Sequence, residues 1–251
     1  MSQFIAWPKI PRWNREVVIT EKIDGTNGAV IIEEHPLGTT AEGGDVSPYL
    51  LASLAPEGVG PTLDDGLLEF EYHVYAQSRT RLVRPGVGKE AGNDNYGFAA
   101  WVQERAGGLV KLLGPGRHFG EFYGKGVARN YGLDHRRFAL FDAKRWAEAL
   151  GDLGNHVLSP GLRVDVVPVL ATLDTPGQSL GGYSEVEFEL DMLRDNGSVL
   201  IPGFMRPEGV VLFHTASQQT YKVLLEGDEL PKGKVTRGER VAAEAREASL
   251  V

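Results

Sequence analysis

A lysine, an aspartate and a glycine lie close together in residues 21–28, which read EKIDGTNG. Apolar, β-branched residues precede this stretch (VVIT) and follow it (AVII), so the lysine stands at the end of a predicted buried strand. Lys22 could extend to solvent from a hairpin turn at Asp24 and Gly25. It could instead be a nucleophile, which requires the neutral amine that nearby cations and partial desolvation favour. The stretch alone does not decide between these alternatives.

Five further motifs place single polar residues inside apolar, strand-like segments or at their ends. In order they are SRTR (78–81), FGEFYG (119–124), FALFDA (138–143), PEGVVLF (207–213) and TYKVL (220–224). A rigid sheet holds such side chains in fixed positions. Together with EKIDGTN, and in this order, the motifs resemble those of ATP-dependent polynucleotide ligases. Within these, the chain is most similar to the phage-type RNA ligases that seal nicks in duplex RNA, from about residue 16 to residue 226.

The resemblance implies a role for each residue of the first motif. Lys22 would attack the α-phosphate of ATP and form lysyl–AMP, a phosphoamide. Asp24 and Gly25 would form the turn that aims the lysine, and Gly25 would let the backbone approach the nucleotide. Glu21 and Asn27 are assigned to nucleotide binding by the same resemblance.

The next three motifs would hold the rest of the nucleotide. Arg79 matches an arginine that contacts phosphates of the nucleotide and the nucleic acid, for which a forked guanidinium is suited. Glu121 matches a glutamate that accepts hydrogen bonds from ribose hydroxyls, and Phe141 an aromatic residue that stacks on adenine. The alternatives are a solvated carboxylate at Glu121 and a core phenylalanine at Phe141.

The last two motifs concern charge on the phosphates. Glu208 matches a carboxylate that holds the catalytic Mg²⁺ or Mn²⁺, which phosphoryl transfer needs. Lys222 matches a lysine that binds the α-phosphate and keeps the nucleophile deprotonated. Many relatives carry a second lysine where this chain has Leu224. Lys232 or Lys234 could take its place, or one cation could suffice.

Patterns of apolar residues predict the elements that must position these side chains. Strands are expected at 16–20, 29–34, 67–78, 117–124, 136–143, 162–170, 208–213 and 220–226. Apolar stripes predict helices over 95–113 and from Ser184 to Gly197, the second with a capping box at Ser184 and Glu187. Residues 35–66 are rich in Gly, Pro, Asp and Thr, which predicts a long loop or insertion.

Strands dominate and helices are inserted between them, which favours an α+β fold with antiparallel sheets. The resemblance implies a nucleotidyltransferase (ATP-grasp-like adenylylation) domain of such sheets flanked by helices, with the ATP cleft between the sheets. We expect a single adenylyltransferase domain over residues 1–251, no separate C-terminal clamp domain, and a charged tail over 227–251.

Composition narrows the classes of function. The chain has 251 residues, a formal net charge of −8 and no cysteine, which excludes disulfides, thiolate catalysis and zinc–cysteine sites. Its six histidines show no metal-ligand spacing. No apolar run could span a bilayer and the N-terminus does not resemble a secretion signal, so we predict a cytoplasmic protein without membrane contact.

The sequence therefore predicts an ATP-dependent RNA ligase that joins 5′-phosphate and 3′-hydroxyl ends through lysyl–AMP and an adenylylated end. Its expected partners are RNA ends, possible in a nicked duplex, with DNA not excluded, and a partner protein could supply a clamp. The alternatives are a small DNA ligase, a more distant GTP-using capping enzyme, and a nucleic-acid-end sensor that adenylylates itself without joining ends.

Overall fold

The computed structural model describes residues 6–38, 47–55, 70–86, 94–151, 155–174 and 183–228. The chain forms two compact units, which we describe one at a time. Unit 1 comprises Met1–Lys22, Val169–Val199 and Met205–Val251, and unit 2 comprises Ile23–Pro168 and Leu200–Phe204. The chain passes from unit 1 to unit 2 directly after Lys22, inside the EKIDGTNG motif. A single adenylyltransferase domain over 1–251 stays a prediction.

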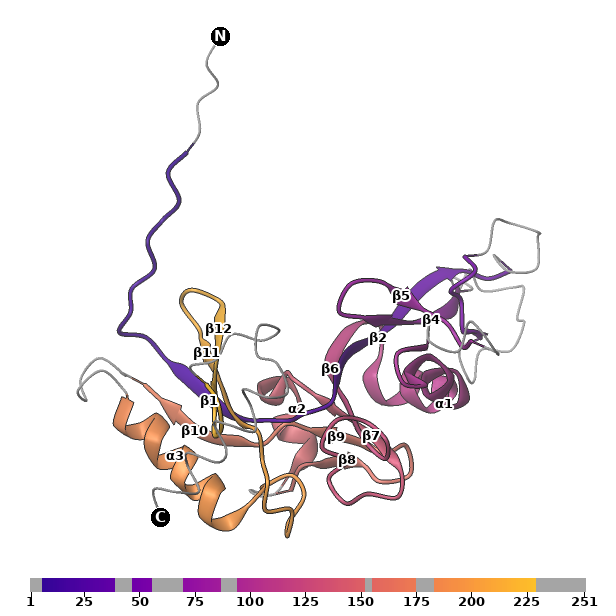
Figure 1. Cartoon of the computed structure of the whole chain (residues 1–251). Coiled ribbons are helices and arrows are strands. Elements are labelled where there is room, and N and C mark those ends of the chain that lie inside the picture. Colours follow the sequence, from indigo (N-terminus) through magenta and orange to yellow (C-terminus); the bar gives the residue numbers. More distant parts are fainter. Residues whose placement is uncertain are drawn as a thin grey trace. The chain divides into compact units, whose positions relative to one another are not determined.

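Unit 1 is built on a sheet of four antiparallel strands, called sheet A, in the order β10-β1-β11-β12. The strands are β1 (Val17–Lys22), β10 (Val169–Leu173), β11 (Gly209–His214) and β12 (Gln219–Leu224). Helix α3 (Tyr183–Asn196) packs on one face through Val186, Leu190 and Leu193. Side chains alternate along β1, so Val17 and Ile19 are buried in this core while Lys22 lies on the opposite face. Figure 1 shows the strands of this sheet and α3 beside them.

Unit 2 is built on an eight-stranded sheet, called sheet B, whose main path runs β3-β4-β2-β6-β7-β9-β8, with β5 paired to β4. The central strands are β2 (Thr26–Pro36), β4 (Phe70–Ser78), β6 (Gly116–Gly124) and β7 (Arg136–Leu140). The shorter strands are β3 (Ala52–Leu54), β5 (Leu82–Val83), β8 (Val157–Ser159) and β9 (Val164–Val166). Its pairings are antiparallel except that β7 and β9 run parallel.

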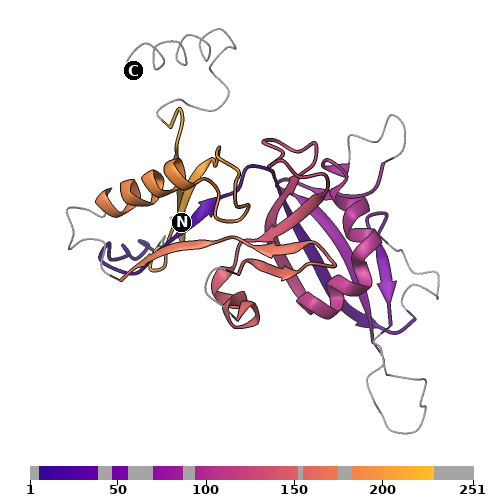
Figure 2. The ribbon, with the colours of Figure 1, turned by 90° about the horizontal axis from the view of Figure 1, so that it is seen from below.

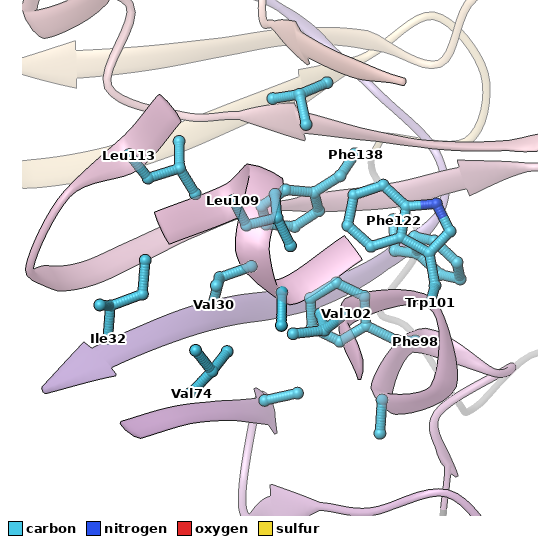
Figure 3. Packing of buried hydrophobic residues seen from close by; sticks show 14 of the residues in the cluster. Val30, Ile32, Val74, Phe98, Trp101, Val102, Leu109, Leu113, Phe122 and Phe138 are labelled. Carbon is cyan, nitrogen blue, oxygen red and sulfur yellow. The ribbon is translucent and has the colours of Figure 1, made fainter. Parts of the chain in front are cut away.

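One face of sheet B is covered by helix α1 (Phe98–Leu113), which lies across the strands in Figure 2. Phe98, Trp101, Val102 and Leu109 of this helix meet strand residues such as Val30, Val74, Phe122 and Phe138 (Figure 3). Burial of these aromatic and aliphatic side chains is the main stabilising contribution to this unit. The opposite face carries Asn27 and Glu121 together with Tyr123 and Ala139, which belong to a second buried cluster.

The strands on either side of the first motif are confirmed, but they do not form a hairpin. β1 pairs with β10 and β11 in sheet A, whereas β2 pairs with β4 and β6 in sheet B. Asp24 and Gly25 therefore connect two different sheets. The hairpin reading was wrong because strand propensity is local, whereas pairing depends on distant segments.

The predicted helices are confirmed as α1 and α3, and Gly107 and Gly108 lie inside α1. Gly197 ends α3 as expected, with a φ of 80° and its N–H 2.9 Å from the Leu193 carbonyl oxygen. The Ser184 side chain of the predicted capping box is outside the described residues. So are most of the predicted 35–66 loop and of the 227–251 tail; the described part of that loop contains β3 and the end of β2.

Two segments differ from the predictions. Residues 162–170 form two strands in different sheets, β9 in sheet B and β10 in sheet A, because Pro168 lacks the N–H that a continuous strand needs. The predicted strand over 136–143 ends at Leu140, and helix α2 (Ala143–Leu150) follows, capped where Asp142 accepts a hydrogen bond from the Arg145 N–H. The α+β class with antiparallel sheets is confirmed. In the described part of the chain, no helix has the length and apolar character to span a membrane.

Candidate active site

Lys22 ends strand β1 and forms an ion pair with Glu208, the residue before β11. Its Nζ donates a hydrogen bond to Glu208 Oε2 over 2.5 Å. The Lys22 side chain is 18% exposed and that of Glu208 is 8% exposed, so the pair is largely shielded from water. The register explains the contact, because Lys22 lies directly opposite Gly209 in the β1–β11 ladder. A shielded amine held in place beside a carboxylate has the geometry that a lysine nucleophile requires.

Gly209 makes the close approach of β11 to β12 possible. Its φ is +145°, and a Cβ atom there would lie 2.2 Å from the Val223 carbonyl oxygen. The neighbouring Glu208 carbonyl accepts a hydrogen bond from the Leu225 N–H over 3.0 Å. The backbone of the PEGVV motif is therefore fixed against β12 at both Glu208 and Gly209.

Lys222 shares the open face of sheet A with Lys22. Cross-strand partners point to the same face of a sheet, and Thr20, Val211 and Lys222 lie opposite one another on β1, β11 and β12. Lys22 is two residues from Thr20 and so lies on this face too. Leu224 lies opposite Gly209, in the row that contains Lys22. Leu224 thus places an apolar side chain in the row of Lys22, where many relatives carry a second lysine.

Glu21 points to the face opposite that of Lys22, as strand alternation requires. The residue is buried, and its Oε2 accepts a hydrogen bond from the Val199 N–H over 2.9 Å. This contact ties β1 to the segment after α3. It gives Glu21 a positioning contact within unit 1, while its assigned role in nucleotide binding stays a prediction.

Asp24 and Gly25 are held by side chains of unit 2. The Asp24 N–H donates to the Tyr131 hydroxyl over 2.8 Å, and Arg129 Nε donates to Asp24 Oδ2 over 3.1 Å. Neither partner could be identified as such from the sequence, because they are more than 100 residues away and lie in a loop. The signal available was only that Arg129 is basic.

Gly25 packs directly on strand β6 and accepts no larger residue there. A Cβ atom at this position would lie 2.3 Å from the Phe122 carbonyl oxygen. The Gly25 N–H donates to Glu121 Oε1 over 3.1 Å. Gly25 was predicted to let the backbone approach the nucleotide. In this structure, a glycine is needed there because the backbone of residue 25 lies against β6.

Glu121 and Asn27 are brought together on the face of sheet B opposite α1. They are direct partners in the β2–β6 ladder, and the Glu121 side chain is partly buried. Gly28, the residue after Asn27, faces α1 instead, since a Cβ there would meet the Phe98 ring. Asn27 and Glu121 are both partly buried and share the face opposite α1, where their polar groups can contact a ligand.

Phe141 follows β7 directly and is 40% exposed, which excludes the alternative of an ordinary core phenylalanine. Its N–H donates to the Phe119 carbonyl oxygen over 3.0 Å, which extends the β6–β7 pairing by one step. An exposed aromatic ring on a fixed backbone is suited to stacking on a planar ligand.

Arg79 lies just after β4, and its side chain is exposed. The turn that contains it is closed by Ser78, whose N–H donates to the Arg81 carbonyl oxygen over 2.8 Å. Arg81 and Arg84 line a pocket of about 110 Å³ together with Tyr49 and Leu82. Three guanidinium groups therefore come from a single short segment beside the end of β4, which suits a ligand that carries phosphates.

A second contact that the sequence did not reveal involves Asn95. Thr26 Oγ1 donates to Asn95 Oδ1 over 2.9 Å, and Asn95 Nδ2 donates to the Asn27 carbonyl oxygen over 3.3 Å. Asn95, Tyr96 and Gly97 have φ values of 47°, 61° and 83°. Consecutive left-handed residues are strained, and such strain is maintained only when surrounding contacts fix it. Asn95 thus anchors the start of β2, which lies inside the EKIDGTNG motif.

A buried ionic cluster supports the same region of sheet B. Arg137 forms a bidentate pair with Asp165, whose Oδ2 also accepts from the Tyr123 hydroxyl over 2.7 Å. Burial and the Asp165 carboxylate raise the pKa of Tyr123 well above its ordinary value, so it stays a hydrogen-bond donor. Because Asp165 lies opposite Ala139, the cluster fixes strands β6, β7 and β9 against one another.

Few carboxylate and imidazole side chains in the described residues are placed to bind a divalent cation. The described residues contain no group of three or more His, Asp or Glu side chains that could hold a metal ion. Glu208 offers one carboxylate, which fits Mg²⁺ or Mn²⁺ in the manner usual for phosphoryl transfer, where water and substrate phosphates supply the other ligands. The Lys22 amine at 2.5 Å shows that this carboxylate attracts a positive charge.

The structure thus gathers the predicted residues into two sets. Within unit 1 it brings together Lys22 and Glu208 and places Lys222 on the same face of sheet A. Within unit 2 it brings together Gly25, Asn27 and Glu121, and leaves Arg79 exposed after β4 and Phe141 exposed after β7.

Comparison with known proteins gives the following matches. A family model described as RNA ligase matches residues 15–223. A solved structure of Naegleria gruberi RNA ligase, an apo aspartate-to-alanine mutant, is 17% identical with a TM-score of 0.44, and the match covers 84% of this chain and 49% of that chain. A lysine-to-alanine mutant of that ligase with ATP and Mn is 17% identical, with a TM-score of 0.42 and the same coverage. This chain therefore spans about half the length of these ligases. A search of curated protein sequences found no match.

Proposed function

Because this chain belongs to the RNA ligase family, we propose that it is an ATP-dependent RNA ligase that joins a 5′-phosphate end to a 3′-hydroxyl end. The observation that carries the proposal is the shielded pair of Lys22 and Glu208 at the end of β1. Lys22 is the one amine side chain in the motif and can form a phosphoamide bond to AMP, and here that amine is fixed by strand register.

In the first step, the Lys22 amine loses a proton and its lone pair attacks the α-phosphorus of ATP. The Nζ–P bond forms, the bond between the α-phosphorus and the bridging oxygen breaks, and pyrophosphate leaves. Lys222, on the same face of sheet A, supports this step because its charge binds the α-phosphate.

In the second step, an oxygen of the RNA 5′-phosphate attacks the AMP phosphorus, and the Lys22 amine is the leaving group. In the third step, the 3′-hydroxyl attacks the adenylylated 5′-phosphate, a phosphodiester forms and AMP leaves. Both steps depend on placing two reacting groups close together, which accounts for a large part of catalysis in reactions of this kind. The exposed guanidiniums of Arg79 and Arg81 are suited to hold the strand that carries the 5′-phosphate.

A divalent cation, Mg²⁺ or Mn²⁺, would be held by Glu208 and would offset negative charge on the phosphates. Some of the solved Naegleria ligase mutants hold ATP and Mn or AMP and Mn, which supports this choice, and others are apo. The remaining nucleotide contacts follow from the family resemblance. Glu121 would accept from the ribose hydroxyls, Phe141 would stack on adenine, and Asp24 and Asn27 would fix the backbone beside the reactive lysine.

The proposal is tested by incubating the protein with Mg²⁺ or Mn²⁺ and α-labelled ATP or GTP, one at a time. We expect covalent labelling by ATP and much less by GTP, reversed by pyrophosphate and labile to acid. Lys22→Ala should abolish labelling, with Lys144→Ala on the exposed surface of α2 as the control. Labelling that persists in Lys22→Ala would overturn the assignment.

One observation favours a second function, an adenylylating sensor of nucleic-acid ends. Leu224 occupies the row of Lys22 and Gly209, where many relatives have a second lysine. A protein with weaker phosphate neutralisation could adenylylate itself yet join ends poorly. A gel assay with nicked RNA and nicked DNA duplexes distinguishes the sensor from the RNA ligase. A sensor would leave both duplexes unjoined, whereas a ligase would seal the RNA. A cytoplasmic location, and a partner protein that supplies a clamp, stay predictions from the sequence.

A further inference from the structure

The segment before β1 repeats a pattern of three residues. Residues 7–15 read WPK, IPR and WNR. We call Trp7, Ile10 and Trp13 the apolar triad. We call Lys9, Arg12 and Arg15 the basic triad. A repeat of three residues differs from the period of a strand, which is two residues, and from that of an α-helix, which is 3.6. It matches a conformation with three residues per turn.

The 3₁₀ helix and polyproline II both have that period, and the two prolines favour polyproline II. Pro8 and Pro11 fix their own φ angles near the required value, and each disfavours the helical region for the residue before it. Residues 6–12 contain no helix or strand and run extended in Figure 1, and the segment bends at residues 13–15, where the Arg15 N–H donates to the Trp13 carbonyl oxygen over 2.8 Å. In the extended part Trp7 and Ile10 lie along one edge and Lys9 and Arg12 along another, with successive members about 9 Å apart.

The end of the segment next to β1, residues 13–16, is fixed on sheet A, and we call it the root. The Trp13 ring stacks on His214 of β11 with centroids 5.4 Å apart, and His214 Nε2 donates to the Trp13 carbonyl oxygen over 2.9 Å. The Thr215 N–H donates to the Glu16 carbonyl oxygen over 3.0 Å. Ahead of this root the apolar triad faces solvent, with Trp7 86% exposed and Ile10 82% exposed. Even Trp13 is 57% exposed, so its indole keeps a free surface.

The charge of the segment differs in sign from that of the whole chain. Residues 7–15 contain three basic residues and no acidic one, although the chain carries a formal net charge of −8. A local row of cations on an acidic protein is complementary to a polyanion. Proteins that bind single-stranded nucleic acid combine such cations with exposed aromatic side chains on which bases stack. A protein domain that reads polyproline segments would need the prolines, but it would not need two indoles and a regular basic row.

We propose that residues 7–15 form an arm that binds a single-stranded stretch of the RNA substrate. The basic triad contacts phosphates, and the indoles of Trp7 and Trp13 stack on bases. This inference rests on the proposed RNA ligase function and adds to it a binding site that none of the six motifs contains.

The register of sheet A places the arm at a distance from the reactive lysine. Val17 pairs with His214 and Lys22 pairs with Gly209, so the root lies five residues along β1 from Lys22. That separation is roughly 17 Å. At about 3.4 Å per stacked nucleotide, a strand bound at both places needs on the order of five nucleotides or more. The arm should therefore contribute to the binding of longer RNA and not to that of very short RNA.

The deciding variant exchanges two neighbouring residues, Lys9→Ile with Ile10→Lys, in the full chain. It keeps the composition and the net charge but moves one member of each triad to the wrong edge. Binding to fluorescent 5′-phosphorylated RNA of about four and about twelve nucleotides is measured by anisotropy, with self-adenylylation as the control for folding. We expect the exchange to weaken binding of the longer RNA about tenfold and to leave both the shorter RNA and self-adenylylation unchanged. The longer RNA should also quench tryptophan fluorescence in the wild type, and less in Trp7→Ala.

Three other outcomes would overturn the arm. If Lys9→Gln with Arg12→Gln weakens binding but the exchange variant binds like the wild type, only net charge matters and no ordered arm exists. If both variants bind RNA normally and self-adenylylate, the segment does not contact RNA, although the proposed function stands. If, in addition, an SH3-type domain binds the wild type and not Pro8→Ala with Pro11→Ala, the segment is a protein-docking site. Failure of the wild type to self-adenylylate would instead overturn the proposed function itself.

Discussion

The Lys22 amine lies 2.5 Å from the Glu208 carboxylate, and the two residues are 186 positions apart in the chain. Strands β1 and β11 bring them together, with Lys22 opposite Gly209. Each group therefore satisfies the charge of the other. In the proposed reaction this pair must separate, because the amine would attack phosphorus and the carboxylate would hold a cation.

Loss of the Glu208 carboxylate should impair self-adenylylation more than it impairs folding. We expect Glu208→Ala and Glu208→Gln to lower the rate on the order of a hundredfold or more, because a charge needed in the transition state is no longer placed. Single-turnover labelling with α-labelled ATP measures this. Glu34→Ala, an exposed carboxylate at the outer part of β2, is the matched control. A well-folded Glu208→Ala protein with a near-normal rate would contradict the role.

Asn95 should act through Thr26 and Asn27, and three substitutions separate its backbone role from its side-chain role. Asn95→Gly removes both hydrogen bonds but accepts the left-handed backbone, whereas Asn95→Ala also adds about 1 kcal/mol of strain or more. Asn95→Asp keeps an acceptor for the Thr26 hydroxyl. Melting temperatures should fall in the order wild type, Asp, Gly, Ala.

Adenylylation rates should instead be equally low in Asn95→Gly and Asn95→Ala, because both lack the side chain that holds the start of β2. A Thr26→Ala and Asn95→Ala double-mutant cycle should show that the two effects on rate are not additive. Rates that simply follow melting temperature would indicate a structural role alone.

Phe141 should contribute to ATP binding through its exposed ring. Phe141→Ala should raise the KM for ATP by a few-fold to about tenfold, since aromatic stacking is worth about 0.5–1.5 kcal/mol. Phe141→Trp should retain most of the affinity because it keeps a stacking surface. The neighbouring Phe119, which is 46% exposed, provides a control as Phe119→Ala. Equal KM values in Phe141→Ala and the wild type would remove Phe141 from the nucleotide site.

The stability of the fold should fall on mild acidification because of His118. Burial lowers the pKa of this imidazole below its ordinary value, and its Nε2 donates to the Gly114 carbonyl oxygen over 2.9 Å. Because the pKa of this histidine is lower in the folded state than in the unfolded state, its protonation favours the unfolded state. Its contribution is therefore present above the unfolded value of about 6.5 and decreases as pH falls below it.

Thermal unfolding between about pH 7.5 and pH 5.5 measures this dependence. We expect the melting temperature of the wild type to decrease over that interval, and that of His118→Gln to decrease less, since glutamine can still donate to Gly114. His156, whose pKa is also lowered by burial, should account for part of the remainder. An identical pH profile in both proteins would contradict the assignment to His118.

The sequence by itself determined the motifs, most of the strands and the two long helices. Local patterns suffice for these, because strand alternation, helical stripes and the Lys-x-Asp-Gly spacing are each contained within a few neighbouring residues. The order of the six motifs then indicated the family, and the exposed position of Phe141 agrees with the role that this resemblance implied.

Only the tertiary structure decided which strands pair and which side chains meet. It showed that β1 and β2 belong to different sheets, that Lys22 pairs with Glu208, and that Asn95 holds Thr26. These contacts join residues from 69 to 186 positions apart, and no local pattern encodes them. Pairing of distant strands depends on the burial of whole faces against α1 and α3, which is a property of the assembled core and not of any single segment.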